Sequence, residues 1–172
     1  MLDVLQILTT ILAALVMAPA LAHVLELPGK MRLTRDRYLT VQPIYYPGFT
    51  IAGIGEAAGL ILTLILLFIT PEGTTLFWLT LVALIGFVGM QVVYWIFTHP
   101  VNKYWLEGQQ LTNMSSTFFL SDPLGGSHRT LQVPESGWMK LRDRWEYSHA
   151  VRAGFALISL LALIIALKSS TP

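Results

Sequence analysis

A histidine and a carboxylate lie three residues apart at the end of the first apolar segment, where His23 is followed by Glu26. Residues at this spacing share one face of a helix, so both side chains should point to the same side. The same residue types recur in reverse order where the last apolar segment begins, as Glu146 and His149. Because Glu-x-x-His pairs hold carboxylate-bridged metals in helical bundles, the two pairs together raise a metal site as one hypothesis.

Further polar side chains lie within the apolar segments or at their ends. Glu56 lies in the second segment, Gln91 and His99 lie in the third, and Arg152 lies in the fourth. An ionisable group inside a bilayer is costly and is by default a functional hypothesis. The helical rise puts Glu56 and Gln91 in a common layer roughly 12 Å inside the membrane, and we expect Arg152 to reach Glu56.

The composition predicts an integral membrane protein. Hydrophobic residues make up 54% of the 172 residues and charged residues 12%, whereas about a quarter of a soluble domain is charged. The absence of cysteine excludes disulfides, thiolate ligands and covalently attached c-type haem, so a metal would need histidine, carboxylate or backbone oxygen ligands. We expect no nucleic acid partner, because the basic residues are confined to two loops.

Four apolar runs are each long enough for a membrane helix, at about 4–25, 48–70, 74–98 and 148–167. They predict an all-α membrane protein of one domain, 1–172, in which four transmembrane helices form an up-down bundle. A long polar loop, 101–144, should connect the third and fourth helices outside the bilayer. Gly55 and Gly59 give the second helix a small-residue face, which suggests close contact with a second copy in a homo-oligomer.

The basic residues also predict the orientation. Only Lys168 lies at the end of the bundle that carries the chain termini. Nine basic residues lie in or beside the two long loops: Lys30, Arg32, Arg35, Arg37, Lys103, Arg129, Lys140, Arg142 and Arg144. The positive-inside rule therefore places both loops in the cytoplasm and both termini outside.

In this arrangement the candidate residues converge at the cytoplasmic face, and three interpretations stay open. The first is a metal site for haem, iron or copper, with His23, His99, His149, Glu26 and Glu146 as ligands. The second is a metal-free pocket in which the catalytic residues are His23, His149, Glu56 and Arg152. The third is a purely structural polar network. The candidates for contact with a cofactor are Trp145, Gln91 and Tyr94.

Three motifs together resemble a known family. They are His23-x-x-Glu26-Leu27-Pro28-Gly29-Lys30, then Tyr45-Tyr46-x-Gly48-Phe49, and finally Arg144-Trp145-x-x-x-His149-x-x-Arg152. Over nearly its whole length the chain resembles the anthrone oxygenase-like family of small four-helix membrane proteins. For some fungal members the family implies insertion of oxygen into an anthrone to give an anthraquinone, while most bacterial members have no assigned reaction. The motif positions that match are His23, Trp145, His149 and Arg152.

We therefore expect an oxidoreductase or oxygenase-like protein of the bacterial inner (plasma) membrane, acting on a small apolar aromatic or quinone-like molecule. Two mechanisms stay open. Neutral imidazoles with a carboxylate could hold a metal that has an open position for oxygen, or a histidine could remove an acidic proton and leave a carbanion that reacts with oxygen directly. The alternative is a non-catalytic membrane subunit or small transporter with a structural network of Glu56 and Arg152.

Overall fold

The computed structural model describes residues 2–45, 48–105 and 137–169, which form helices and turns without a strand. In chain order the elements are α1 (Leu2–Lys30), α2 (Arg35–Val41), the 3₁₀ helix η1 (Gln42–Tyr45), α3 (Gly48–Ile69), α4 (Thr75–Val93), the π-helical turn η2 (Tyr94–Thr98), α5 (His99–Trp105) and α7 (Trp138–Ser169). Within these described residues, four helices are long and apolar enough to cross a membrane: Leu2–Lys30, Ile51–Ile69, Thr75–Asn102 and Trp138–Ser169.

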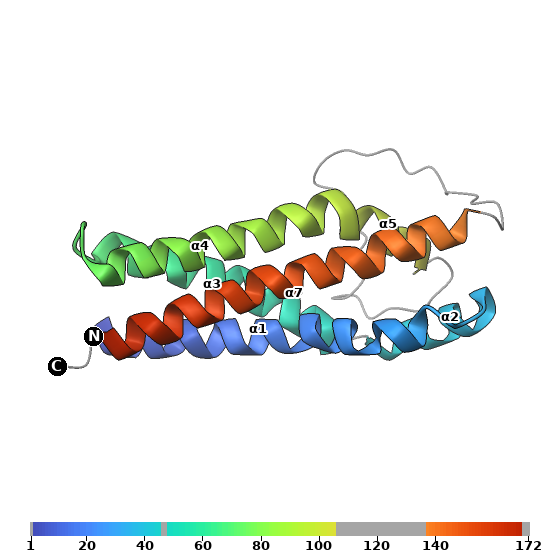
Figure 1. Cartoon of the computed structure of the whole chain (residues 1–172), viewed down its shortest axis with the longest axis horizontal. Helices are drawn as coiled ribbons and strands as arrows, with labels where there is room; N and C mark the ends of the chain where they lie inside the picture. Colours follow the sequence, from blue (N-terminus) through green and yellow to red (C-terminus); the bar gives the residue numbers. More distant parts are fainter. Residues whose placement is uncertain (1, 46–47, 106–136, 170–172) are drawn as a thin grey trace.

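The long helices lie side by side along one axis (Figure 1), with both chain termini at one end of the bundle and α2 and α5 at the other. Helix α7 packs against α1 and α4, and α3 packs against the same two helices. The four helices therefore enclose a common interior.

That interior contains both small and large apolar side chains, among them Phe87 and Met90, and large apolar side chains also cover the outside. Ala13, Ala83 and Ala156 are buried in the main core, whereas Leu25 is 74% exposed and Phe68 is 81% exposed. Apolar surface on this scale is rare on a soluble monomer and is the expected covering of helices that contact lipid.

Buried hydroxyl groups in the helices are satisfied locally. Thr9 donates to the carbonyl of Leu5 at 2.7 Å, one turn back, which suits a polar group without access to water. Ser159 instead donates to the carbonyl of Ala83 at 2.9 Å and so links α7 to α4. These bonds leave the ionisable side chains as the main polar feature of the interior.

The third span changes its winding near its end. Pro100 has no N–H, so the carbonyl of Ile96 loses its helical donor, and the guanidinium of Arg144 in α7 donates to that carbonyl instead. The π-helical turn lies in the same stretch, and such turns frequently occur at functional sites. Its residues Tyr94 and Thr98 are buried toward the interior.

The predicted helix 48–70 is confirmed, but three other boundaries were wrong. Helix α1 continues through Pro28 to Lys30, α5 extends the third span to Trp105, and α7 begins at Trp138. Both ends of the predicted loop 101–144 are therefore helical, and residues 106–136 lie outside the described part of the chain.

The glycine face of α3 is used inside the chain. A Cβ at Gly59 would lie 2.8 Å from the ring of Phe87 in α4, and one at Gly55 would lie 3.8 Å from Val16 in α1. This face therefore packs against helices of the same chain, and the suggestion that it joins two copies stays a prediction.

Candidate functional site

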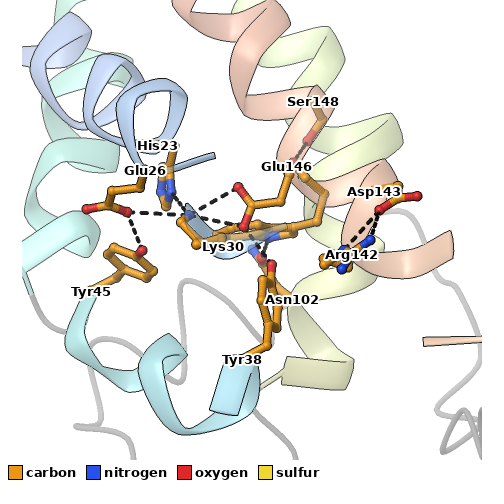
Figure 2. A network of polar contacts seen from close by, with 11 residues as sticks. His23, Glu26, Lys30, Tyr38, Tyr45, Asn102, Arg142, Asp143, Glu146 and Ser148 are labelled. Atoms are coloured by element: carbon orange, nitrogen blue, oxygen red, sulfur yellow. Dashed lines mark hydrogen bonds and ion pairs between the residues drawn. The ribbon is translucent and has the colours of Figure 1, made fainter. Parts of the chain in front are cut away.

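Lys30, the last residue of α1, lies at the centre of a buried polar network (Figure 2). Its side chain is 6% exposed, and its ammonium contacts Nδ1 of His23 at 3.0 Å, the carboxylate of Glu146 at 3.1 Å and that of Glu26 at 3.4 Å. An ammonium has three N–H donors and no acceptor, so these three contacts use its full capacity.

The carboxylate of Glu146 has a second partner. Tyr38 from α2 is fully buried and donates its hydroxyl to Oε1 of Glu146 at 2.7 Å. Burial, followed by the negative charge of Glu146, raises the pKa of the Tyr38 phenol above its ordinary range, so Tyr38 remains a donor.

Aromatic rings surround the same ammonium. The Lys30 nitrogen lies 5.0 Å from the ring centroid of Tyr45 and 5.3 Å from that of Trp145, within the range of cation–π attraction. Tyr45 also donates its hydroxyl to Glu26, which is 45% exposed in its side chain. Lys30 is therefore held by charges and by rings together.

A second polar unit, centred on Arg152, lies deeper in the bundle than the first unit, which is the network around Lys30. As predicted, Arg152 of α7 reaches Glu56 of α3, with Nη2 donating to Oε2 at 2.6 Å. The other terminal nitrogen, Nη1, contacts Nδ1 of His149 at 3.2 Å, and the guanidinium lies 5.2 Å from the ring centroid of Tyr94. Each unit thus joins one cationic side chain to one imidazole and to carboxylate.

The two units meet at their histidines. The ring centroids of His23 and His149 lie 4.0 Å apart with an interplanar angle of 33°, so the rings are in contact. Trp145 packs against both, at 4.9 Å from His23 and 4.3 Å from His149, and donates its Nε1–H to Asn102 at 2.7 Å. The expectation that these histidines occupy matched layers of α1 and α7 is thereby confirmed.

A cavity of about 170 Å³ lies beside this histidine pair. Its aromatic walls are Tyr45, Phe49, Tyr94, Trp95 and Trp145. The ionisable and amide side chains that line it are His23, Glu56, Gln91, Asn102, His149 and Arg152. The cavity therefore combines apolar and aromatic walls with a few polar groups from α1, α3, α4, α5 and α7, which is the usual character of a small-molecule site.

Oε1 of Glu56, Nε2 of His149 and Nε of Arg152 are buried polar atoms of cavity-lining residues that have no hydrogen-bond partner in the described part of the chain. A guanidinium can only donate, so Nδ1 of His149 accepts from Arg152 and the imidazole proton resides on Nε2. The site thus offers one open acceptor, on Glu56, and two open N–H donors, on His149 and Arg152. Buried polar atoms are rarely left unpaired, which makes these atoms candidates for ligand contact.

The predicted metal ligands do not form a metal site in the described residues, where no three His, Asp or Glu side chains are grouped to hold an ion. The physical reason is Lys30, whose ammonium already occupies the position between His23, Glu26 and Glu146. The contact between the two imidazole rings also leaves no space for a haem plane between them. The site therefore does not fit a metal or haem held by these ligands.

The remaining predicted residues are divided between the cavity and its surroundings. Gln91 lines the cavity and accepts a hydrogen bond from Nε1 of Trp95 at 3.2 Å. His99 is not among the described residues that line it, and its ring packs on Trp95 and Tyr94 at 4.8 and 5.7 Å. The expectation that His99 joins His23 and His149 was wrong, because α5 directs it to a neighbouring aromatic cluster.

The sequence interpretation did not assign Lys30 or Tyr38 to the site. Lys30 follows Glu26 by four residues, a spacing that repeats on one helix face. Pro28 and Gly29 concealed this signal, because they are typical of a helix end. Tyr38 comes from a short helix in a segment interpreted as loop and carried no comparable signal.

The fold and the site define a helical bundle with four candidate membrane spans and a partly open cavity lined by aromatic and polar side chains. Comparison of the chain with models of protein families, with curated proteins and with solved structures found no match. Membership of the anthrone oxygenase-like family therefore stays a hypothesis, and the function is argued below from the geometry of the site.

Proposed function

We propose that the protein is a membrane-embedded oxidoreductase of the oxygenase type that binds a small aromatic or quinone-like molecule in its cavity. One observation carries the proposal: an acceptor, Oε1 of Glu56, and a donor, Nε2 of His149, are both open in a pocket with five aromatic walls. An aromatic ring bearing a hydroxyl or carbonyl oxygen would satisfy both atoms and fill the space between the rings.

The size of the cavity restricts the substrate class. A cavity of about 150 Å³ in another protein holds benzene, so about 170 Å³ accommodates one substituted ring. The three fused rings of an anthrone exceed this volume, and only one of them would lie inside. Monocyclic phenols and hydroquinones therefore fit the cavity better. The anthrone implied by the family resemblance is larger than the cavity.

Proton removal is the chemistry that this pair of groups supports. The free oxygen of Glu56 would accept a proton from a phenol or from a carbon beside a carbonyl, and the N–H of His149 would stabilise the resulting oxyanion. Dioxygen would then oxidise the anion. For a CH₂ group beside a carbonyl, one oxygen atom becomes the new carbonyl oxygen and the other leaves as water with the two hydrogens.

We further propose that the four helices cross the inner membrane of a bacterial cell alternately, as an up-down bundle with a cytoplasmic loop between the third and fourth spans. Support comes from the concentration of basic residues at the α2 end and from the position of both termini at the other end. A substrate dissolved in lipid would then reach a site buried among the helices.

The competing function is a non-catalytic subunit or small transporter, in which Glu56 and Arg152 serve only as a buried ion pair. The observation that favours it is the pair itself, because the 2.6 Å contact already satisfies one carboxylate oxygen. Binding and turnover measurements separate the two functions.

The test uses purified protein in lipid nanodiscs. Binding of phenol and hydroquinone is measured by quenching of tryptophan fluorescence, and oxygen consumption is measured with hydroquinone and anthrone. We expect Glu56→Gln to lower oxygen consumption by about a hundredfold or more, the usual contribution of a general base. The control Glu72→Gln, on the exposed turn between α3 and α4, should leave it unchanged.

The melting temperature of each variant is recorded so that loss of activity is distinguished from loss of fold. Wild-type protein that binds none of these molecules and consumes no oxygen would overturn the proposal. A partner protein that co-purifies in fixed ratio with such an inactive protein would establish the competing function.

A further inference from the structure

Lys30 lies behind His23 as seen from the cavity. It is not among the described cavity-lining residues, yet its ammonium lies 3.0 Å from Nδ1 of His23, which does line the cavity. Only 5% of Lys30 is exposed, and two carboxylates balance its charge. Among the cavity-lining side chains, the lysine makes its polar contact with the histidine, and it lies over the rings of Tyr45 and Trp145.

The contact determines where His23 carries its proton. An ammonium donates and cannot accept, so Nδ1 of His23 must be the acceptor. A neutral imidazole with Nδ1 as acceptor carries its hydrogen on Nε2, the nitrogen that Lys30 does not touch. Arg152 imposes the same tautomer on His149 through the contact of 3.2 Å between Nη1 and Nδ1.

We infer that Lys30 is a positioning residue that holds His23 as its Nε2–H tautomer, so that His23 and His149 together present two N–H donors to an aromatic oxyanion. The ring centroids lie 4.0 Å apart and both residues line the cavity, so one ligand oxygen can contact both rings. The inference rests on the proposed function and deepens it. It names the class of ligand, which is a phenol that binds in its ionised form, the phenolate.

The charges balance in this arrangement. The O–H bond of a bound phenol breaks and its proton forms a new O–H bond with Oε1 of Glu56, so the net charge of the site is unchanged. The phenolate oxygen then accepts hydrogen bonds from the two imidazoles. Oriented N–H donors of this kind stabilise an oxyanion strongly when water is excluded.

The first test observes the tautomers directly. Nitrogen-15 NMR of histidine-labelled protein distinguishes Nε2–H from Nδ1–H, and His23→Gln identifies the His23 signals. We expect Nε2–H in the wild type and in Lys30→Arg, whose guanidinium is also a pure donor, and a mixture of tautomers in Lys30→Met. The control Lys140→Met, at an exposed position of α7, should match the wild type.

Loss of Lys30 leaves Glu146 buried without its cation, and Lys30→Met can therefore fail to fold. The double variant Lys30→Met with Glu146→Gln removes the buried carboxylate together with its cation, leaves only the half-exposed Glu26 charged, and provides the same measurement without a buried unpaired charge. An Nδ1–H signal or an imidazolium signal for His23 in the wild type overturns the inference. Unchanged His23 signals in a folded variant that lacks Lys30 also overturn it.

The second test uses 4-nitrophenol, whose phenolate absorbs visible light. We expect the wild type and Lys30→Arg to bind it as phenolate below its solution pKa, and the variant lacking Lys30 to bind it at least tenfold more weakly. Binding as the neutral phenol overturns the oxyanion assignment. If the wild type binds neither 4-nitrophenol nor hydroquinone, the proposed function fails together with that assignment, whereas the histidine spectrum still decides the role of Lys30.

Discussion

At the scale of single residues, the interior tolerates charge because each cation is matched to carboxylate. Lys30 is paired with Glu146 and Glu26, and Arg152 is paired with Glu56. Removing one partner of a buried pair commonly costs about 3–5 kcal/mol, because the other charge is left without compensation. Variants that leave the charge pattern intact are therefore the cleanest probes of the site, and Tyr38 offers one.

We predict that Tyr38→Phe lowers stability at neutral pH by about 1.5–3 kcal/mol, the usual contribution of a hydrogen bond to a charged group. In the unfolded chain this phenol ionises near pH 10, whereas burial and the Glu146 carboxylate raise its pKa in the folded protein. The folded form is therefore fully favoured below pH 10 and loses stability as the pH rises above that value.

Tyr38→Phe should remove this part of the alkaline loss, so its stability should decline less steeply than that of the wild type above pH 10. Denaturation in detergent over a pH series, with ultraviolet absorbance of tyrosinate, measures both effects. Parallel declines in the two proteins would contradict the prediction.

Only some residues of the site could be predicted from the sequence. The spacing of His23 and His149 on opposite helices was sufficient to predict that they meet, because antiparallel helices align residues at equal depth. The contact of Lys30 with the site could not be predicted in this way, because it depends on α1 continuing through Pro28. Proline is normally evidence for a helix end. The acceptor role of Nδ1 in both histidines depends on three-dimensional contacts alone.

At the scale of elements, the packing of α4 against α7 requires a glycine, because the two helices leave no space for a side chain at Gly86. A Cβ at Gly86 would lie 2.1 Å from Oγ of Ser159 and 2.9 Å from the backbone oxygen of Phe155. The backbone oxygen cannot move aside without shifting α7, which also carries His149 and Arg152. This contact therefore couples helix packing to the site.

We predict that Gly86→Ala destabilises the protein by about 1–3 kcal/mol or more, as overpacking of a close contact does. The matched control is Gly154→Ala on α7, where an added Cβ meets nothing within 4 Å. Alanine has the higher helix propensity by about 1 kcal/mol, so this variant should be neutral or slightly stabilised. Thermal melting in detergent compares the two, and equal melting temperatures would show that the α4–α7 contact is not close.

Helix existence was easier to predict from the sequence than helix length. The apolar run at 48–70 is bounded by a proline on each side, Pro47 and Pro71, and α3 has nearly the predicted bounds. The last membrane segment was predicted to begin at 148, with a helical run over 141–147 before it, because five of the ten residues 138–147 are charged, whereas α7 begins at Trp138. Their helix is stabilised by aromatic contacts instead, since Trp138 packs against Tyr38 with ring centroids 6.0 Å apart.

At the scale of the whole molecule, the distribution of charge around the apolar bundle determines the expected orientation in the membrane. Nine basic residues in or beside the two long loops, compared with Lys168 alone at the end that carries the termini, favour a cytoplasmic position for the α2 end. The cavity and the Lys30 network would then lie in the cytoplasmic half of the bilayer, which determines from which side polar reactants reach them.

We predict that alkaline phosphatase, which folds only outside the cytoplasm, is active when fused after Ser169 and after Gly73. Green fluorescent protein, which matures in the cytoplasm, should fluoresce only when fused after Val41, between the first and second spans. Replacing Arg32, Arg35 and Arg37 with alanine should weaken this pattern, because these residues contribute to the retained positive charge. Fluorescence from the fusion after Ser169 would reverse the orientation and place the cavity in the outer half of the bilayer.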